Sequence, residues 1–518
     1  MIFLLSISFI FCAKYIIILK PEYSNDQFSR NEIESILIEN NSNFKKIRLG
    51  YISELNFSTF KELKSTKKIK FIEKDSTVKV ESFIDNNFIG NNKDKYINNT
   101  IYDDNFIDNY INNTINGNYI DNNKINNNYM DNKIYDDFLD NKIFDNFKKN
   151  ENETGKNIKS NQDKIIIDQL NANWGLSRLS SGHLPSQESK FRYPKNPGKG
   201  VKIFILDTGI DVTHKEFEGR AEMGKNFVDE INTDENGHGT HCAGIAAGKN
   251  VGVAKESKII GVKVLNKLGK GEVSDVVMGI DYVIDYFEKE KEINEQIPIF
   301  KMRETVHELK NEVGNKIFFD GNEKIKNLIK KFSEINSKKK SNPKFVVNMS
   351  IGGVKSKAMD MMVAYGTSLG INFIVAAGNE NKNACNFSPS SNNFAITVGA
   401  SDKNDRESSF TNFGDCVDVY APGVGILSSI PQQEYKMYSG TSMASPHVAG
   451  VASIYLSEKD MSPFELKEKI IKNAYKIIKI KNKEPRMKFF GLFKSKRNNM
   501  LLVSIRKHLR EIYYNNNL

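Results

Sequence analysis

Three residues of the kinds used in nucleophilic catalysis stand at the ends of predicted secondary-structure elements. Asp207 ends an apolar run in LDTGID, His238 opens a helical stretch in NGHGTHCAG, and Ser442 opens another in GTSMASPHVAG. A serine hydroxyl needs a base that takes its proton, and an imidazole needs a carboxylate that holds its tautomer and stabilises the imidazolium. The three residue types therefore predict a catalytic triad, provided that folding brings them together.

The surroundings of Ser442 suit a nucleophile whose reaction creates an oxyanion. Small residues flank it, and Gly440 lets the backbone pass close to a substrate. At the N-terminal end of a helix, free N–H groups and the helix dipole favour negative charge. A serine alone is common, so this argument depends on the partners elsewhere in the chain.

The elements that must position these residues predict an α/β fold with a doubly wound, mainly parallel sheet flanked by helices. Nearly continuous apolar runs, typical of buried parallel strands, alternate with helical patterns. The predicted strands are 201–206, 259–264, 345–349 and 372–377, and the predicted helices are 243–247, 273–287 and 357–369. Ligands of such sheets bind at the carboxyl ends of the strands, and Asp207 stands at such an end.

The region before this sheet divides into three predicted segments. Residues 1–13 are an apolar run ending in alanine, which predicts a short secretory signal, with a buried N-terminal strand as the alternative. Residues 14–80 have the strand and helix patterns of a small α+β unit. Residues 81–165 are rich in Asn, Asp and Ile and have too few core-forming residues, so we expect a disordered linker.

The remaining chain is predicted to be one large domain with additions. The domain covers residues 166–503, and residues 288–341 interrupt it as a charged insertion of helical pattern. Residues 504–518 form a basic C-terminal tail, for which a solvated face is favoured over contact with a membrane surface.

Composition limits the classes of partner. The net charge of +10 comes from lysines scattered through low-complexity segments, and no nucleic-acid motif accompanies it, so no nucleic-acid partner is expected. After the first residues no apolar run approaches the roughly 18 residues needed to span a bilayer, so stable membrane insertion is not expected. Cys385 and Cys416 flank a strand-like segment and are a candidate disulfide, which would suit an oxidising compartment.

The motifs DTGID, HGTHCAG, AAGN and GTSMASPHVAG, in this order, resemble the subtilisin-like serine protease (subtilase) family. WGLSR, and VGASDKNDRESSFTNFG before CVDVYAPG, resemble its proteinase K and cerevisin branch, and the resemblance covers residues 174–502 apart from the insertion. It implies that Asp207 orients His238, that His238 is the general base and then acid, and that Ser442 attacks the scissile carbonyl. It also implies that Asn379 of AAGN donates its side-chain amide to the oxyanion.

The resemblance further implies a cleft in which a peptide substrate is held as an added strand between two exposed backbone edges. The matching residues are Gly269, Lys270 and Gly271 on one side and Ser350, Ile351 and Gly352 on the other. The adjoining wall contains Ala377 and Gly378, which are small, and no acidic residue lies in the matched segments. A broad, mainly apolar preference at the residue before the cut is expected, with Lys/Arg-directed cleavage as the narrower alternative.

No cofactor is required for this chemistry, but a structural calcium ion is one expectation. Asp418 matches the calcium-binding aspartate of the branch, and backbone carbonyls near Asn393 and Ala395 are possible co-ligands. All of these offer oxygen atoms, the ligands that calcium prefers. A solvated aspartate is the alternative.

The front unit, residues 14–80, resembles the inhibitor propeptide of the family, an intramolecular inhibitor that normally runs straight into the protease.

Two hypotheses follow. The favoured one is a secreted zymogen of a serine endopeptidase, extracellular or within the secretory pathway, which acts on proteins and peptides through an acyl-enzyme. The alternative is a catalytically inactive subtilisin-like surface or binding protein. The presence of Asp207, His238, Ser442 and Asn379 together favours the enzyme, since a scaffold has no need of all four.

Overall fold

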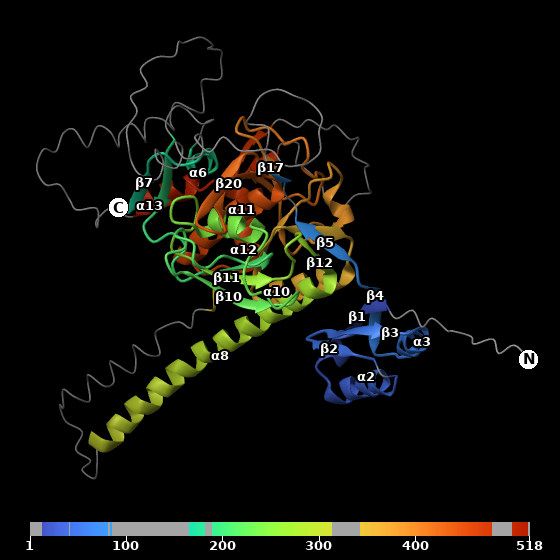
Figure 1. The fold of residues 1–518 in the computed structure, drawn as a ribbon. Helices are drawn as coiled ribbons and strands as arrows, with labels where there is room; N and C mark the ends of the chain where they lie inside the picture. The colour runs from blue at the N-terminus through green and yellow to red at the C-terminus, as the bar shows by residue number, and fades with distance from the viewer. Residues whose placement is uncertain are drawn as a thin grey trace, which may run out of the picture.

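The computed structural model describes residues 13–40, 42–80, 83–84, 165–181, 189–312, 342–478 and 500–515. Within these ranges the centre of the molecule is a sheet of nine strands (Figure 1). In spatial order the strands are β10 (Ala221–Asn226), β11 (Lys258–Lys263), β9 (Lys202–Asp207), β13 (Phe345–Met349), β15 (Asn372–Ala376), β17 (Ile396–Ser401), β18 (Val419–Pro422), β22 (Met500–Leu502) and β21 (Tyr475–Ile478). Neighbours pair in parallel except β21, which is antiparallel to β22.

The direction in which strands are added reverses between β9 and β13. From β9 the sheet extends through β11 to β10 on one side, and through β13 to β18 on the other. The carboxyl ends of β9 and β13 therefore flank a topological switch point, where α/β sheets place their ligand sites. The predicted doubly wound, mainly parallel sheet is confirmed.

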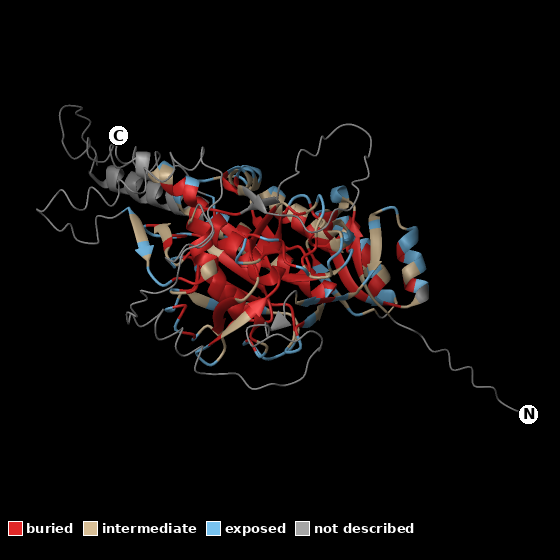
Figure 2. Cartoon of the chain, turned by 90° about the horizontal axis from the view of Figure 1, so that it is seen from above, coloured by how far each residue is buried: buried red, intermediate tan, exposed pale blue. Residues whose placement is uncertain are grey.

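Helices cover both faces of the sheet because its central strands are apolar on both sides. Ile203 and Ile205 of β9 pack in one core cluster with residues of α7 (His238–Ala247) and α11 (Thr441–Glu458). Phe204 and Leu206, which point to the opposite face, pack in a second cluster with residues of α8 (Val273–Glu312) and α10 (Lys357–Leu369). Figure 2 shows that buried residues in general are concentrated in the middle of the large domain, in the sheet and the helices packed against it.

Helix α8 is longer than the pattern predicts. It runs for 40 residues and projects away from the sheet (Figure 1). The predicted helix 273–287 and the first part of the predicted insertion, residues 288–312, are thus one continuous helix. Residues 313–341 lie outside the described residues.

The front unit has the α+β organisation that the sequence predicts. It contains β1 (Ala13–Leu19), α1 (Pro21–Ser24), α2 (Gln27–Glu39), β2 (Phe44–Ile47), β3 (Gly50–Leu55), α3 (Phe57–Ser65) and β4 (Ile69–Lys74). Its strands form an antiparallel sheet in the order β2-β3-β1-β4, and Ile17, Leu37 and Leu63 are fully buried in its core. Residues 1–12, most of the predicted signal, and 85–164, most of the predicted linker, lie outside the described residues.

Smaller elements complete the large domain. They are β7 (Ile166–Gln169), α6 (Trp174–Ser180), β8 (Phe191–Pro194), the 3-10 helix η2 (Ala384–Asn386), β16 (Phe387–Ser388), β19 (Ile426–Ile430), β20 (Glu434–Ser439), α12 (Pro463–Asn473) and α13 (Arg506–Asn515). Cys385 and Cys416 form a disulfide with their Cα atoms 5.4 Å apart. None of the described helices has the length and apolar character that crossing a membrane would require.

The predicted basic tail is partly built into this domain. Ile505 and Leu509 are buried in the same core cluster as α11 and α12, and the hydroxyl of Tyr455 donates to the carbonyl oxygen of Ser504 at 3.1 Å. The basic composition of the segment conceals this apolar stripe, in which Ile505 and Leu509 are one helical turn apart.

Candidate active site

Asp207 and His238 meet at the carboxyl end of β9. Helix α7 begins at His238, whose Nδ1 donates to Asp207 Oδ1 at 2.7 Å, and both residues are buried. The backbone N–H of Thr208 donates to the same carboxylate oxygen at 2.8 Å. The bond fixes the imidazole with Nε2 as its basic nitrogen, as general-base catalysis requires.

The Asp207 carboxylate also controls the charge of the imidazole. Burial is the largest single influence and lowers the pKa of His238, but the charge and hydrogen bond of Asp207, together with those of Cys242, outweigh it, so the pKa of His238 lies well above its ordinary value of 6.5. The site therefore stabilises the imidazolium that forms when His238 accepts a proton.

Ser442 is held at the start of α11 beside the end of β13. Its hydroxyl donates to the carbonyl oxygen of Ser350 at 2.9 Å, and the hydroxyl of Ser350 donates back to the carbonyl oxygen of Ser442 at 2.9 Å. The thiol of Cys242 lies near both His238 and Ser442, 3.9 Å from His238 Nδ1 and 3.5 Å from the carbonyl oxygen of Ser442. Among the described residues His238 Nε2 has no hydrogen-bond partner, so the nitrogen that would take a proton is available.

The side chain of Asn379 lies at the N-terminal end of α11, the helix that contains Ser442. Its side-chain oxygen accepts hydrogen bonds from the backbone N–H and the hydroxyl of Thr441, each at 3.0 Å. Because the oxygen end is held by Thr441, the amide NH₂ is the end that can donate to a substrate oxygen. This orientation is the one that an oxyanion donor next to Ser442 needs.

The two predicted substrate-binding segments lie on either side of one extended peptide, and that peptide belongs to this chain. Strand β5 (Thr77–Val80) pairs antiparallel with β12 (Lys270–Glu272) on one side and with β14 (Ile351–Val354) on the other. Lys79 is opposite both Lys270 and Gly352 in the register. The end of the front unit thus occupies the cleft as a substrate would.

Glycine at position 269 permits the close approach of the two backbones. Its backbone φ is +68°, an angle that residues other than glycine rarely adopt. A Cβ atom at this position would lie 3.0 Å from the side chain of Val80. The backbone N–H of Val80 donates to the carbonyl oxygen of Gly269 at 3.0 Å. A larger residue would separate the cleft edge from its occupant.

The same peptide is paired again beyond the nucleophile. Strand β6 (Phe83–Ile84) pairs antiparallel with β20 at Tyr438 and Ser439, three residues before Ser442. Residues 83–84 of the predicted linker, which was expected to be disordered over 81–165, therefore belong to this strand pairing. Strands β5 and β6 thus pair with two segments near Ser442, β14 directly after Ser350 and β20 shortly before the start of α11.

The body of the front unit is anchored on α8 and α10. Arg48 forms ion pairs with Asp281, Asp285 and Glu288 of α8. Glu73 accepts from the first backbone N–H groups of α10, at 2.8 and 3.2 Å, and Asp75 accepts from Ser274 N at the start of α8 at 3.0 Å. Carboxylates at helix N-termini satisfy free N–H groups and interact favourably with the dipole.

The sequence argument missed one polar residue of the cleft, Glu380. Its carboxylate lies 3.3 Å from the ammonium of Lys79, the third of the four residues of β5, and it accepts from Asn412 at 2.8 Å. Ala377, in the predicted apolar wall, is fully buried, and Gly378 adjoins it. The signal was present in the sequence, because Glu380 directly follows Asn379 in AAGNE.

The expected calcium ligands are close together, but a side chain lies among them. Asp418 and the carbonyl oxygens of Asn393 and Ala395 all surround the ammonium of Lys467. Elsewhere in the described residues, Asp207, His238 and Cys242 have ligand atoms within 4.8 Å of one another. Two of these three already share the His238–Asp207 hydrogen bond, so this group is part of the candidate active site.

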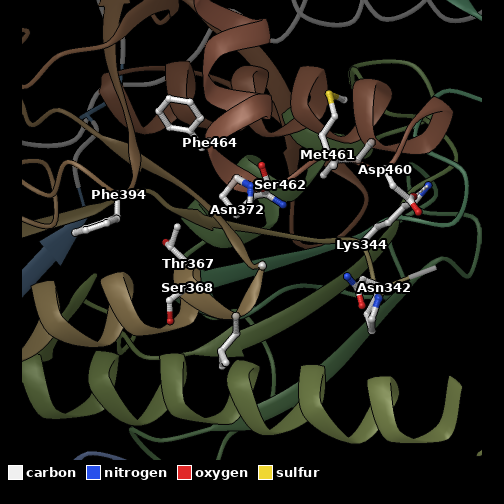
Figure 3. Close-up of a pocket in the computed structure, with 15 residues that line it drawn as sticks. Asn342, Lys344, Thr367, Ser368, Asn372, Phe394, Asp460, Met461, Ser462 and Phe464 are labelled. Carbon is white, nitrogen blue, oxygen red and sulfur yellow. Dashed lines mark ion pairs between the residues drawn. The ribbon is translucent and has the colours of Figure 1, made fainter. Parts of the chain in front are cut away.

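A cavity of about 500 Å³ lies at the opposite edge of the sheet (Figure 3). It is lined by Lys344 and Asn372, at the amino ends of β13 and β15, and by Phe394 and Phe464, which are largely exposed. It contains none of the triad residues and is separate from the cleft.

Comparisons with known proteins show which family the chain resembles. A family model described as the subtilase family matches residues 198–303 and 310–500. Subtilisin-like proteinase 1 of Encephalitozoon cuniculi is 44% identical over 312 residues, which cover 60% of this chain and 67% of that protein. Cerevisin of Saccharomyces cerevisiae is 38% identical over 328 residues, which cover 60% of this chain and 45% of cerevisin.

A solved structure titled as a cold adapted subtilisin-like serine proteinase is 36% identical, covers 58% of this chain and 92% of its own, and has a TM-score of 0.46. Subtilisin-like protease 3 of Saccharomyces cerevisiae is 40% identical and is covered over 58% of its length. The match thus spans about half of each of the two yeast relatives. Because the family model matches more than half of the chain, the chain belongs to the subtilase family.

Proposed function

We propose that this chain is the zymogen of a serine endopeptidase that cleaves proteins and peptides with broad, mainly apolar specificity. One observation carries the proposal. The chain's own β5 lies between β12 and β14 and ends opposite Ile351, which follows the Ser350 carbonyl that accepts from Ser442, while Asp207 and His238 are hydrogen-bonded to each other. This arrangement is expected of an enzyme held in complex with its own cleavage segment.

In the proposed reaction His238 takes the proton of Ser442 as its oxygen attacks the scissile carbonyl. Asp207 stabilises the resulting imidazolium, and the amide of Asn379 together with the backbone N–H of Ser442 stabilises the oxyanion. The leaving amine takes the proton from His238 and departs, which leaves an acyl-enzyme on Ser442. Water, deprotonated by His238, then releases the acid and restores the serine.

The first substrate proposed is the chain itself. Strand β5 ends at Val80 and β6 begins at Phe83, and their partners Ile351 and Ser439 each lie within a few residues of the Ser350–Ser442 hydrogen bond. We place self-cleavage between Val80 and Phe83. The released front unit remains bound as an inhibitor, since its contacts with α8 and α10 do not depend on the cleaved bond.

The proposed compartment is extracellular or within the secretory pathway. The apolar run at residues 1–13 and the disulfide between Cys385 and Cys416 support it, because disulfides persist in oxidising compartments.

Ser442→Ala tests the proposal. The full-length chain and the variant are expressed in parallel, and the products are followed by gel and by N-terminal sequencing. We expect the unchanged chain to yield a mature form that begins between Glu81 and Phe83, and Ser442→Ala to stay uncut. Ser457→Ala, on the same helix, is the matched control and should process normally.

The inactive alternative predicts a different result. An inactive binding protein would give no cut in either chain, and its Ser442 would not be labelled by an organophosphonate probe. A Ser442→Ala chain that still matured in purified form would also contradict the proposal.

A further inference from the structure

The ammonium group of Lys467 lies where the calcium ion was expected. Its Nζ is 2.8 Å from Asp418 Oδ2, 3.1 Å from the carbonyl oxygen of Asn393 and 2.6 Å from that of Ala395. The side chains of Lys467 and Asp418 are 19% and 11% exposed, so the group is largely removed from water.

The hydrogen-bonding capacity of the ammonium matches these oxygens. An ammonium has three N–H donors and no acceptor, and here three oxygens face it at hydrogen-bond distance. Calcium takes six to eight oxygen ligands at about 2.3–2.6 Å, so the ion and the ammonium compete for one position.

The charge also fits a single positive group. Asp418 supplies one negative charge, and among the described residues it belongs to no cluster of three acidic, histidine or cysteine ligands. One ammonium neutralises one carboxylate, whereas a divalent ion would leave an excess positive charge in a largely buried place.

Helix α12 holds the lysine in this position. The helix begins with a capping box between Ser462 and Glu465, and Leu466 and Ile470 on either side of Lys467 are buried in the core. The ammonium therefore links α12 to the segments that lead into β17 and β18, as a structural cation would.

We propose that Lys467 replaces the structural calcium ion at Asp418, so that this subtilase has its stabilising cation built into the chain. The inference concerns stability and does not depend on catalysis. Thermal unfolding of the full chain in the Ser442→Ala background, where self-digestion is excluded, tests it in EDTA and in millimolar calcium chloride.

The Ser442→Ala chain with Lys467 in place should have the same Tm in EDTA and in calcium chloride. Lys467→Ala should lower the Tm in EDTA by on the order of 5 °C, because Asp418 is left without its partner, and calcium should restore part of this loss. Lys469→Ala is the control, since this lysine lies on the same helix and pairs with Glu511 at the surface. A Lys467→Ala chain that folds only when calcium is present would support the proposal as well.

Calcium binding by equilibrium dialysis separates this site from any other. If calcium binds the unchanged chain and raises its Tm, and Asp418→Asn abolishes both effects, the proposal is overturned. If both effects persist in Asp418→Asn, the ion binds elsewhere and the proposal stands. A Lys467→Ala chain as stable in EDTA as the unchanged chain would also overturn it.

Discussion

The backbone N–H of Val80 donates a 3.0 Å hydrogen bond to the carbonyl oxygen of Gly269. This bond joins the last residue of the front unit's β5 to the edge of the catalytic cleft. The inhibitor-like segment and the cleft are therefore neighbouring strands of one sheet, and access of other peptides requires β5 to leave.

Arg48→Ala should shorten the latency of the processed enzyme. Arg48 is paired with three carboxylates of α8, and its loss leaves them facing one another, so the bound front unit should dissociate about tenfold more readily. Hydrolysis of a reporter peptide, followed after dilution of the freshly processed complex, measures the lag. Lys45→Ala, an exposed lysine of β2, is the control, and equal lags in both variants would contradict the assigned anchor.

Activity should be lost as the pH falls through the pKa of His238. Burial lowers that pKa, but Asp207 and Cys242 together raise it well above 6.5, and only the neutral imidazole can take the proton of Ser442. The pH profile of kcat/KM should therefore rise at a pH above the 6.5 of an ordinary imidazole. In Asp207→Asn the acidic limb should move to lower pH, and kcat should fall by about 10⁴. An unmoved limb would mean that another group controls it.

Asn379→Ala should lower kcat by about 10²–10³ with little change in KM, a magnitude taken from the equivalent donor of subtilisin. The reason is that the amide acts on the oxyanion, which exists only after the attack. Steady-state kinetics on a peptide substrate measure the effect, with the exposed Lys382→Ala as control. A change in KM alone would assign Asn379 to substrate binding.

Glu380 should favour a basic residue at the position directly upstream of the one in the Val80 position. The contact between Glu380 and Lys79 is partly exposed, so the preference should be small, about two- to fivefold in kcat/KM for lysine over glutamine. Paired peptides that differ at this one position measure it. In Glu380→Gln the two peptides should be cleaved at equal rates, and a preference that survives would place its origin elsewhere.

Replacing Cys385 and Cys416 together by serine should destabilise the folded enzyme by about 3–4 kcal/mol, since the bond closes a loop with a sequence separation of 31. Chemical denaturation in the Ser442→Ala background measures the change. Cys242, which is free and buried, remains as an internal control for thiol accessibility. Equal stability of the two chains would show that the loop is already ordered without the bond.

Local sequence patterns determined the types of element and the identity of the chemical groups. The apolar runs 201–206 and 345–349 could be assigned as buried strands, because a strand covered on both faces has few polar residues. The residues Asp207, His238, Asn379 and Ser442 could be chosen by type and motif. These features depend on residues close together in the chain, so a single sequence contains them.

Tertiary structure decided the contacts between distant residues. Only folding places Thr77–Val80 between β12 and β14, Lys79 beside Glu380, and Lys467 among the oxygens around Asp418. The local periodicity of apolar residues does not predict such contacts, since each depends on how far two separate elements extend and where they pack. A lysine in an amphipathic helix has the same local pattern whether its ammonium is solvated or buried against a carboxylate, and the neighbouring segments alone decide between the two.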